Sequence, residues 1–177
     1  MNEICICRAG EVDDEIIGAV AELTGARVLP GSLPVAGAWD TGRRQYNSFA
    51  LLKAVAERRP SDASRILGLT ACDLFVPMLS FVFGQAQLGG EAALVSVARL
   101  DQAFHGLPPR RSLLLERTVK TVLHELGHTY GLVHCPDRSC AMALATNVAQ
   151  LDAKEPRYCE SCRALRENHR CNTIGKY

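Results

Sequence analysis

The chain has 177 residues, of which 47% are apolar, with 20 lysines and arginines against 19 aspartates and glutamates. This length fits one domain, and the apolar content excludes a disordered or coiled-coil chain. The formal net charge of +1 gives no electrostatic reason for a nucleic acid or an anionic membrane as partner. No apolar stretch approaches the roughly 20 residues that cross a bilayer, and the N-terminus lacks the pattern of an export signal. We therefore expect a cytoplasmic protein.

The first half of the chain alternates predicted strands and helices. These elements are, in order, a strand at Glu3–Arg8, a helix from Val12 to Leu23, a strand at Arg27–Leu29, a loop at Pro30–Gly42, a helix capped by Asn47 that ends near Glu57, and a strand at Arg65–Ala71. Apolar residues at regular spacing define the elements, and glycines, prolines and capping residues define their ends. This alternation is typical of a sheet with helices packed on it.

Two more strands and a long helix follow. The strands are Leu79–Phe83 and Ala93–Leu100, with Gly89-Gly90 between them. A helix begins after Pro108-Pro109 with Ser112 as its N-cap, and a short helix at Glu160–Asn168 comes last. A hairpin after alternating strands and helices predicts an α+β fold, in which a mixed, twisted sheet has an antiparallel edge strand and backing helices. We assign this edge to Leu79–Phe83, with an interior strand as the alternative for that segment.

The long helix carries two histidines on one face. At 100° per residue, His124 and His128 lie opposite an apolar stripe that can seat the helix on the sheet. Histidines four residues apart are one turn above each other, the separation that two imidazoles need to bind one zinc ion. Glu125 reaches the open side of this metal without being a ligand. The apolar stripe consists of Leu115, Val119, Val122 and Leu126.

His134 supplies the third ligand that a two-histidine site lacks. Gly131 is well placed to end the helix with a positive φ, which glycine adopts at little cost. The chain can then turn sharply and bring His134 back to the metal, whereas in a continued helix His134 would miss it. We therefore predict that His124, His128 and His134 bind one zinc ion and that water takes the fourth position.

Four of the eight cysteines predict a second metal site. Cys135 and Cys140, then Cys159 and Cys162, form two pairs as in a structural zinc site, where four thiolates leave no open position. Two disulfides and an iron–sulfur cluster are the alternatives. Because Cys135 directly follows His134, one extended segment would serve both metals, and we expect the thiolate site to anchor His134.

The other four cysteines are dispersed. Cys5 and Cys7 would share one face of a strand, with Cys72 on a neighbouring strand, so buried apolar packing is their expected role. The sequence leaves the role of Cys171 open.

The run HELGHTYGLVHC, followed by Cys140-Ala-Met142 and Cys159-x-x-Cys162, resembles the archaemetzincin family in the metzincin clan of zinc peptidases. The segments 44–52 and 73–84 are similar to that family as well. The resemblance implies a metzincin-like upper lobe at residues 1–131, which holds the sheet and the active-site helix. It also implies a small lower lobe at residues 132–177, which holds the four-cysteine zinc.

The resemblance further implies that Met142 forms a hydrophobic turn beneath the catalytic metal. One departure follows this turn, because Leu144 stands where several metzincins carry a tyrosine. Stabilisation of the transition state by a tyrosine at this position is therefore absent.

These residues predict a zinc-dependent metallopeptidase. Zinc would activate water, Glu125 would accept its proton and return it to the leaving amine, and an extended substrate would pair with the edge strand. We expect a monomer with two zinc ions that acts on peptides, either as an aminopeptidase or as an endopeptidase of restricted specificity. The alternative is a catalytically weak, zinc-stapled protein that binds extended peptides. Nucleic-acid binding is less supported, because no aromatic series accompanies the arginines of the tail.

Overall fold

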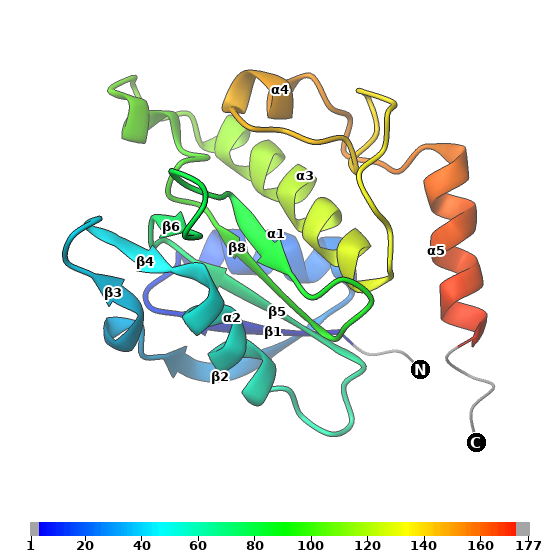
Figure 1. Cartoon of the computed structure of the whole chain (residues 1–177), viewed down its shortest axis with the longest axis horizontal. Coiled ribbons are helices and arrows are strands. Elements are labelled where there is room, and N and C mark those ends of the chain that lie inside the picture. Colours follow the sequence, from blue (N-terminus) through cyan, green and yellow to red (C-terminus); the bar gives the residue numbers. More distant parts are fainter. Residues whose placement is uncertain (1–3, 173–177) are drawn as a thin grey trace.

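The computed structural model describes residues 4–172, with side chains described for residues 4–168 (Figure 1). The strands are β1 (Ile4–Ala9), β2 (Arg27–Leu33), β3 (Trp39–Asp40), β4 (Gln45–Asn47), β5 (Arg65–Thr70), β6 (Leu74–Phe75), β7 (Gly84–Ala86) and β8 (Ala92–Ser96). The α-helices are α1 (Asp14–Thr24), α2 (Ser48–Glu57), α3 (Arg111–Thr129), α4 (Val148–Asp152) and α5 (Glu160–Asn172). Short 3₁₀ turns occur at Ala36–Ala38 and Gln102–His105.

Five strands form the main sheet in the order β2-β1-β5-β8-β7. The first four run parallel to one another, and β7 pairs antiparallel with β8 at one edge. This mixed sheet with an antiparallel edge and packed helices confirms the predicted α+β fold class. A second, small sheet has the order β3-β4-β6.

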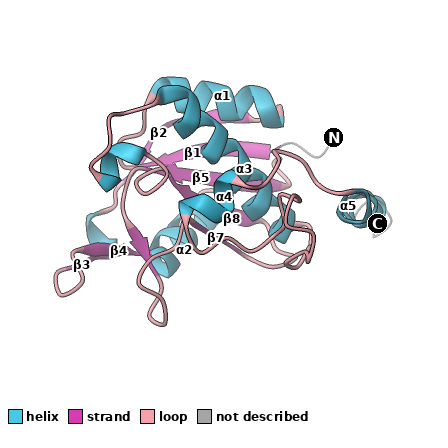
Figure 2. Cartoon of the chain, turned by 90° about the horizontal axis from the view of Figure 1, so that it is seen from above, coloured by secondary structure: helices cyan, strands magenta, loops and turns pink. Residues whose placement is uncertain are grey.

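The two faces of the main sheet carry different helices, because side chains alternate along each strand. On β1, Cys5 and Cys7 belong to the core cluster that includes α2, whereas Ile4 and Ile6 belong to the cluster that includes α1 and α3. Figure 2 shows this layering, with α1 and α2 on opposite sides of the strands. Cys5 and Cys7 are fully buried, so their expected packing is confirmed, whereas Cys72 follows the end of β5 and is only partly buried against the α2 cluster. The side chain of Cys171 lies outside the described residues.

The edge strand is β7, so the prediction that placed this edge at Leu79–Phe83 is wrong. Gly84, Gln85 and Ala86 pair with residues of β8. The more apolar run before them has the composition of a strand, but the carbonyl oxygens of Leu79 and Ser80 accept hydrogen bonds from side chains, and only Val82 and Phe83 form single backbone hydrogen bonds with β6 and β8. Composition alone therefore misplaces the edge by one short segment.

β2 is longer than predicted and takes in part of the expected loop at Pro30–Gly42. The pairing between β1 and β2 shifts register between Ile6 and Arg8, and β2 resumes pairing at Ser32. Pro30 has no N–H to donate, and it is tolerated here because β2 lies at the edge of the sheet. The rest of the predicted loop contains a 3₁₀ turn and β3.

Helix ends follow the predicted capping chemistry in the first half of the chain. Asn47 caps α2, because its side-chain oxygen accepts the N–H groups of Phe49 at 2.9 Å and of Ala50 at 3.3 Å. Gly25 ends α1 with a φ of 65°. The predicted cap of α3 is wrong, because Arg110 takes the N-cap position without a side-chain bond and Ser112 lies inside the helix.

The remaining differences concern the ends of elements and the short ones. β8 ends at Ser96 instead of Leu100, and α5 begins at Glu160 as predicted but extends to Asn172. The two-residue strands and α4 give too short a pattern to be predicted. Within residues 4–172, no helix combines the length and the apolar character needed to cross a membrane. The division into lobes at residue 131 stays a prediction.

A buried thiol makes the stability of this core sensitive to alkaline pH. Burial raises the pKa of Cys7 from 9.0 to about 11, whereas in the unfolded chain the thiol ionises near its ordinary pKa. This thiol is therefore expected to lower the free energy of unfolding by about 2–3 kcal/mol between pH 9 and 11. Urea unfolding of the wild type and Cys7→Ala across this range measures the effect. The two pH dependences should diverge, and parallel curves would contradict a buried neutral thiol.

Candidate active site

Helix α3 places two imidazoles so that they point to one position. Nδ1 of His124 donates to the carbonyl oxygen of Ala141 at 2.8 Å, and Nδ1 of His128 donates to that of Leu132 at 2.7 Å. These bonds orient both rings and leave their Nε2 atoms 3.1 Å apart. Two ligands of a tetrahedral zinc ion, each about 2.0–2.1 Å from the metal, lie about 3.3 Å from each other. The pair therefore fits one zinc, with carbonyl oxygens as its outer partners.

The turn after α3 brings His134 to the same position. Gly131 has a φ of 81°, its N–H bonds to the carbonyl oxygen of His128 at 2.9 Å, and the N–H of Leu132 bonds to that of Gly127 at 3.1 Å. These two bonds form a Schellman motif, which reverses the chain. The structure thus brings together His124, His128 and His134, whose ligand atoms all lie within 4.8 Å of one another.

Glu125 lies beside the three histidines in a cavity of about 390 Å³. Its side chain is buried, and burial raises the pKa of its carboxyl group to about 8, an effect that the positive charge of Lys154 opposes. Burial also lowers the pKa of His124 to about 3 and lowers the pKa values of His128 and His134. The imidazoles are thereby kept neutral, which is the form that binds metal.

β7 passes so close to Glu125 that its first residue has no room for a side chain. A Cβ at Gly84 would lie 2.7 Å from Cγ of Glu125 and 2.7 Å from the carbonyl oxygen of Leu94. Real Cβ atoms do not approach other atoms so closely, so only glycine fits here. The edge of the sheet and the carboxylate therefore form one wall of the cavity.

Met142 is fully buried against α3. A Cβ at Gly127 would lie 2.3 Å from Sδ of Met142, so the absence of a side chain at Gly127 lets the two segments pack together. Ala141, which orients His124, precedes Met142 directly. The turn that contains Met142 thus supports the histidine helix, as the resemblance to metzincins implies.

The four predicted cysteines also come together. The sulfur atoms of Cys135, Cys140, Cys159 and Cys162 lie within 4.8 Å of one another, and those of Cys135 and Cys159 are 3.8 Å apart. Four thiolates about 2.3 Å from a tetrahedral zinc ion are separated by about 3.8 Å, so the cluster fits this metal. The backbone N–H groups of Met142 and Cys159 donate to Sγ of Cys140 and hold this sulfur in the cluster.

The sequence matches known proteins over most of its length. Residues 25–168, which include all seven predicted ligands, match the model of Peptidase family M54. The chain is 38% identical over 165 residues to the archaemetzincin of Methanocaldococcus jannaschii, which covers 90% of this chain and 89% of that protein. The chain belongs to the archaemetzincin family. It is therefore a zinc metallopeptidase, and the family resemblance of its sequence is confirmed.

Two archaemetzincin crystal structures have the same fold. The protein from Methanopyrus kandleri superposes with a TM-score of 0.78 at 37% identity, covering 96% of this chain and 95% of that one. The protein from Archaeoglobus fulgidus, solved in complex with malonate, superposes with a TM-score of 0.78 at 31% identity, covering 92% and 99%.

In this member of the archaemetzincin family, the cysteine cluster and the histidine site share one segment. The N–H of Cys135, next to His134, donates to the carbonyl oxygen of Met142 at 3.0 Å. The hydroxyl of Tyr158, next to Cys159, donates to the carbonyl oxygen of Leu123 on α3 at 2.6 Å. The cluster is therefore tied to both sides of the histidine site.

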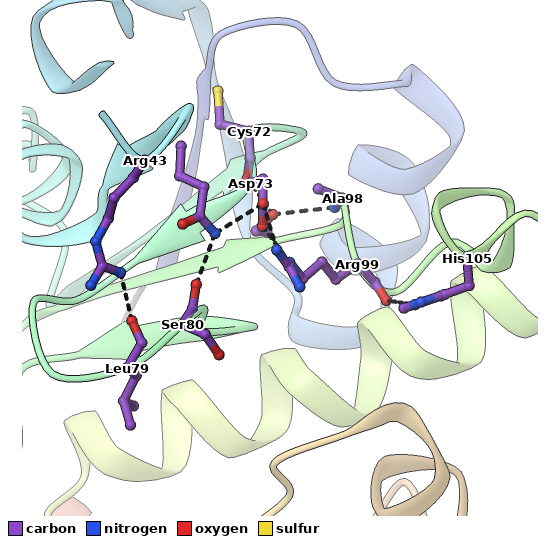
Figure 3. Close-up of polar contacts among 10 residues, drawn as sticks. Arg43, Cys72, Asp73, Leu79, Ser80, Ala98, Arg99 and His105 are labelled. Atoms are coloured by element: carbon purple, nitrogen blue, oxygen red, sulfur yellow. Dashed lines mark hydrogen bonds and ion pairs between the residues drawn. The ribbon is translucent and has the colours of Figure 1, made fainter. Parts of the chain in front are cut away.

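Side chains from the small sheet hold one rim of the archaemetzincin cavity, the loop at residues 77–83 (Figure 3). Arg43 donates to the carbonyl oxygens of Leu79 at 2.7 Å and Pro77 at 3.1 Å. Gln45 donates to that of Ser80 at 3.0 Å. The rim is thus fixed by side chains that the sequence analysis did not single out.

An ion pair supports the same rim from the other side. Arg99 binds Asp73 through two hydrogen bonds of 2.6 and 2.8 Å, and its guanidinium lies 4.3 Å from the ring centre of Phe81, which lines the cavity. Asp73 also accepts a hydrogen bond from Gln45. The similarity of segments 44–52 and 73–84 to the family pointed to these regions but gave no role for these residues.

Charged residues of α3 attach α4 beside the cavity. Arg117 binds the carboxylate of Asp152 through two hydrogen bonds of 2.7 Å, and Lys120 donates to the carbonyl oxygen of Asp152 at 3.0 Å. This attachment brings Lys154, two residues further on, into the wall of the cavity. No motif in the sequence indicates a role for Lys154.

The close approach of β7 to Glu125 predicts a strong effect of one added methyl group. Gly84→Ala should lower the free energy of unfolding by about 1–3 kcal/mol, because neither neighbour can move away freely. Urea unfolding measures this loss of stability. Gly18→Ala is the matched control, since nothing lies within 4 Å of that position on the exposed side of α1. The free energy of unfolding of the control should rise by about 0.5–1 kcal/mol. An unchanged stability of Gly84→Ala would contradict the close packing.

Proposed function

We propose that this zinc metallopeptidase binds its catalytic zinc through His124, His128 and His134 and uses Glu125 as the general base. The observation that carries the proposal is the convergence of the three imidazoles beside a buried carboxylate in the cavity wall. Zinc, when bound, supplies the Lewis acidity that activates water and polarises a peptide carbonyl. The neutral imidazoles and the 3.1 Å separation of two Nε2 atoms suit this ion.

Glu125 provides the proton transfers that peptide hydrolysis requires. Its carboxylate accepts a proton from the attacking water and then donates it to the nitrogen of the leaving amine. The raised pKa of Glu125 makes it a stronger base than an exposed glutamate, and a neighbouring cation moderates this effect. Gly84 allows the strand to confine the carboxyl group beside the reacting bond.

The substrate is a peptide in extended form. β7 pairs with β8 on one side only, and its residues Gly84, Gln85 and Ala86 line the cavity. An extended peptide can therefore pair with the free side of β7, which orients the scissile bond towards Glu125. The fixed rim at residues 77–83 limits the shape of the substrate, which supports restricted specificity.

We propose a second, structural zinc at the four cysteines, in a lower lobe that begins at residue 132. The fit of the sulfur positions to a tetrahedral site supports this count of two zinc ions. The cysteines must be reduced to bind zinc, which favours the cytoplasm. We also expect a monomer that acts on peptides, and the near-neutral charge of the chain gives no attraction to nucleic acids or anionic membranes.

One observation favours the alternative of a peptide-binding protein with little turnover. Leu144, at the position where several metzincins carry a tyrosine, lines the cavity with an exposed apolar side chain. A donor for the transition state is therefore missing there. The substitution Glu125→Gln separates the two functions.

Glu125→Gln should retain the zinc at the histidines and lower kcat on a cleavable peptide by about 10²–10⁴-fold, because the amide cannot accept a proton. Screening a peptide library by mass spectrometry and measuring zinc by atomic absorption test this. Glu22→Gln, at an exposed glutamate of α1, is the control and should keep activity. Equal turnover of wild type and Glu125→Gln would remove Glu125 as the base, and no turnover by either would favour peptide binding alone.

Cys159→Ala should lower the occupancy of both zinc ions, because the cysteine segment positions His134 and the turn at Met142. The zinc content should fall below one ion per chain, with activity lost in parallel. Cys72→Ala, a cysteine outside the cluster, should keep both ions. If Cys159→Ala loses a single ion and keeps its activity, the two sites are not coupled.

A further inference from the structure

The cavity has an open end and a closed end. At the open end, Leu79 and Leu144 are 54% and 58% exposed. At the closed end, Thr121, Leu151 and Lys154 are almost completely buried, and Lys154 is 4% exposed. Thr121 lies one turn of α3 before Glu125, so the closed end extends past the base. A side chain of a substrate bound at the histidines can therefore enter this end.

Lys154 is the single lysine or arginine among the described residues that line the cavity. Its Nζ donates to the carbonyl oxygen of Ala141 at 3.2 Å, and the negative charge of Glu125 acts on it without a hydrogen bond or close ion pair between the two among the described residues. An ammonium group has three N–H donors, so Lys154 has capacity for another acceptor. By contrast, Nζ of the equally buried Lys120 binds Glu116 at 2.7 Å and the carbonyl oxygen of Asp152 at 3.0 Å.

The attachment of the lower lobe does not require a charge at this position. Arg117 and Lys120 already bind Asp152 and hold α4 on α3. A buried ammonium group that is not hydrogen-bonded to its one neighbouring carboxyl group, that of Glu125, is unfavourable, and an apolar side chain of similar length would avoid this cost. The position of Lys154 in the cavity wall supplies a reason for the charge, because an anionic ligand group can pair with it there.

We propose that Lys154 forms the floor of a carboxylate-binding subsite, which selects peptides with a carboxylate close to the scissile bond. This inference rests on the proposed function. Phe83, Ala145 and Leu151 line the same cavity and can contact the methylene groups of an entering side chain. The ammonium group of Lys154 then donates hydrogen bonds to the carboxylate, which is either an aspartate or glutamate side chain or the C-terminus of the peptide.

Peptides that differ only in the carboxylate test the subsite. One set carries glutamate or glutamine on either side of the cleaved bond, and a second set ends in a free acid or an amide one residue beyond that bond. For the wild type, kcat/KM should favour the carboxylate by about 10–100-fold, the range of a hydrogen-bonded charge. In Lys154→Met this preference should disappear, and in Lys154→Arg it should partly return. If Lys154→Met loses the preference in the first set, the carboxylate belongs to a side chain of the peptide. If it loses the preference in the second set, the carboxylate is the C-terminus of the peptide.

A binding measurement makes the test independent of turnover. Calorimetry on zinc-loaded Glu125→Gln should show tighter binding of the carboxylate peptide than of its neutral counterpart. In Glu125→Gln/Lys154→Met this difference in affinity should disappear. Lys53→Met, at an exposed lysine of α2, is the matched control. The thermal unfolding temperature of Lys154→Met should stay the same or rise, whereas a structural role would lower it.

Two results would overturn the proposal. One is an equal loss for acidic and neutral peptides in Lys154→Met, which would make Lys154 a general support of the site. The other is a wild type that binds and cleaves neutral peptides as well as acidic ones. A wild type that cleaves nothing but binds carboxylate peptides through Lys154 would refute the proposed hydrolysis and leave the subsite supported.

Discussion

Two backbone carbonyl oxygens orient the histidine site, and much of the structure serves to hold them in place. The carbonyl oxygen of Leu132 is set by the turn at Gly131, which ends α3. That of Ala141 is set by its neighbours, Cys140 in the sulfur cluster and Met142 against α3. A histidine side chain rotates freely unless its second nitrogen is bound, so these two oxygens determine where the metal-binding nitrogens point.

This dependence explains how the chain beyond α3 folds with few large apolar residues. The described part of the segment that follows packs as a small cluster of Leu132, Met142 and cysteines, with Tyr158 against it. The zinc proposed at these sulfur atoms would compensate for the small core, because a bound ion stabilises the folded form over the unfolded chain. The tie from Tyr158 to Leu123 then fixes the cluster on the active-site helix.

Features set by local sequence could be predicted, whereas features set by distant contacts could not. The spacing of His124 and His128, the turn at Gly131 and the cap at Asn47 each depend on residues within one turn of the chain, and the structure has all three. The family motif added Met142. The rim of the cavity depends on Arg43 and Arg99, which bind residues 36 and 26 positions away, and nothing in the local pattern shows such contacts.

The edge strand and Lys154 were missed for related physical reasons. Three residues of β7 carry too few apolar side chains to be recognised, and the apolar run before them lines the cavity and forms only isolated backbone hydrogen bonds with β6 and β8. Lys154 looks like an ordinary surface lysine in the sequence, because its burial results from α4 being held by Arg117 and Lys120.

The missing side chain at Gly84 has a consequence for the speed of the reaction. A glutamate that must search among rotamers before each proton transfer loses time and conformational entropy at every turnover. The backbone of β7 restricts Glu125 before any peptide arrives, so in the proposed mechanism the carboxyl group would be preorganised for the transition state. The strand proposed to align the substrate is therefore also the one that limits the motion of the proposed base, Glu125, and the distance between the two is built into the fold.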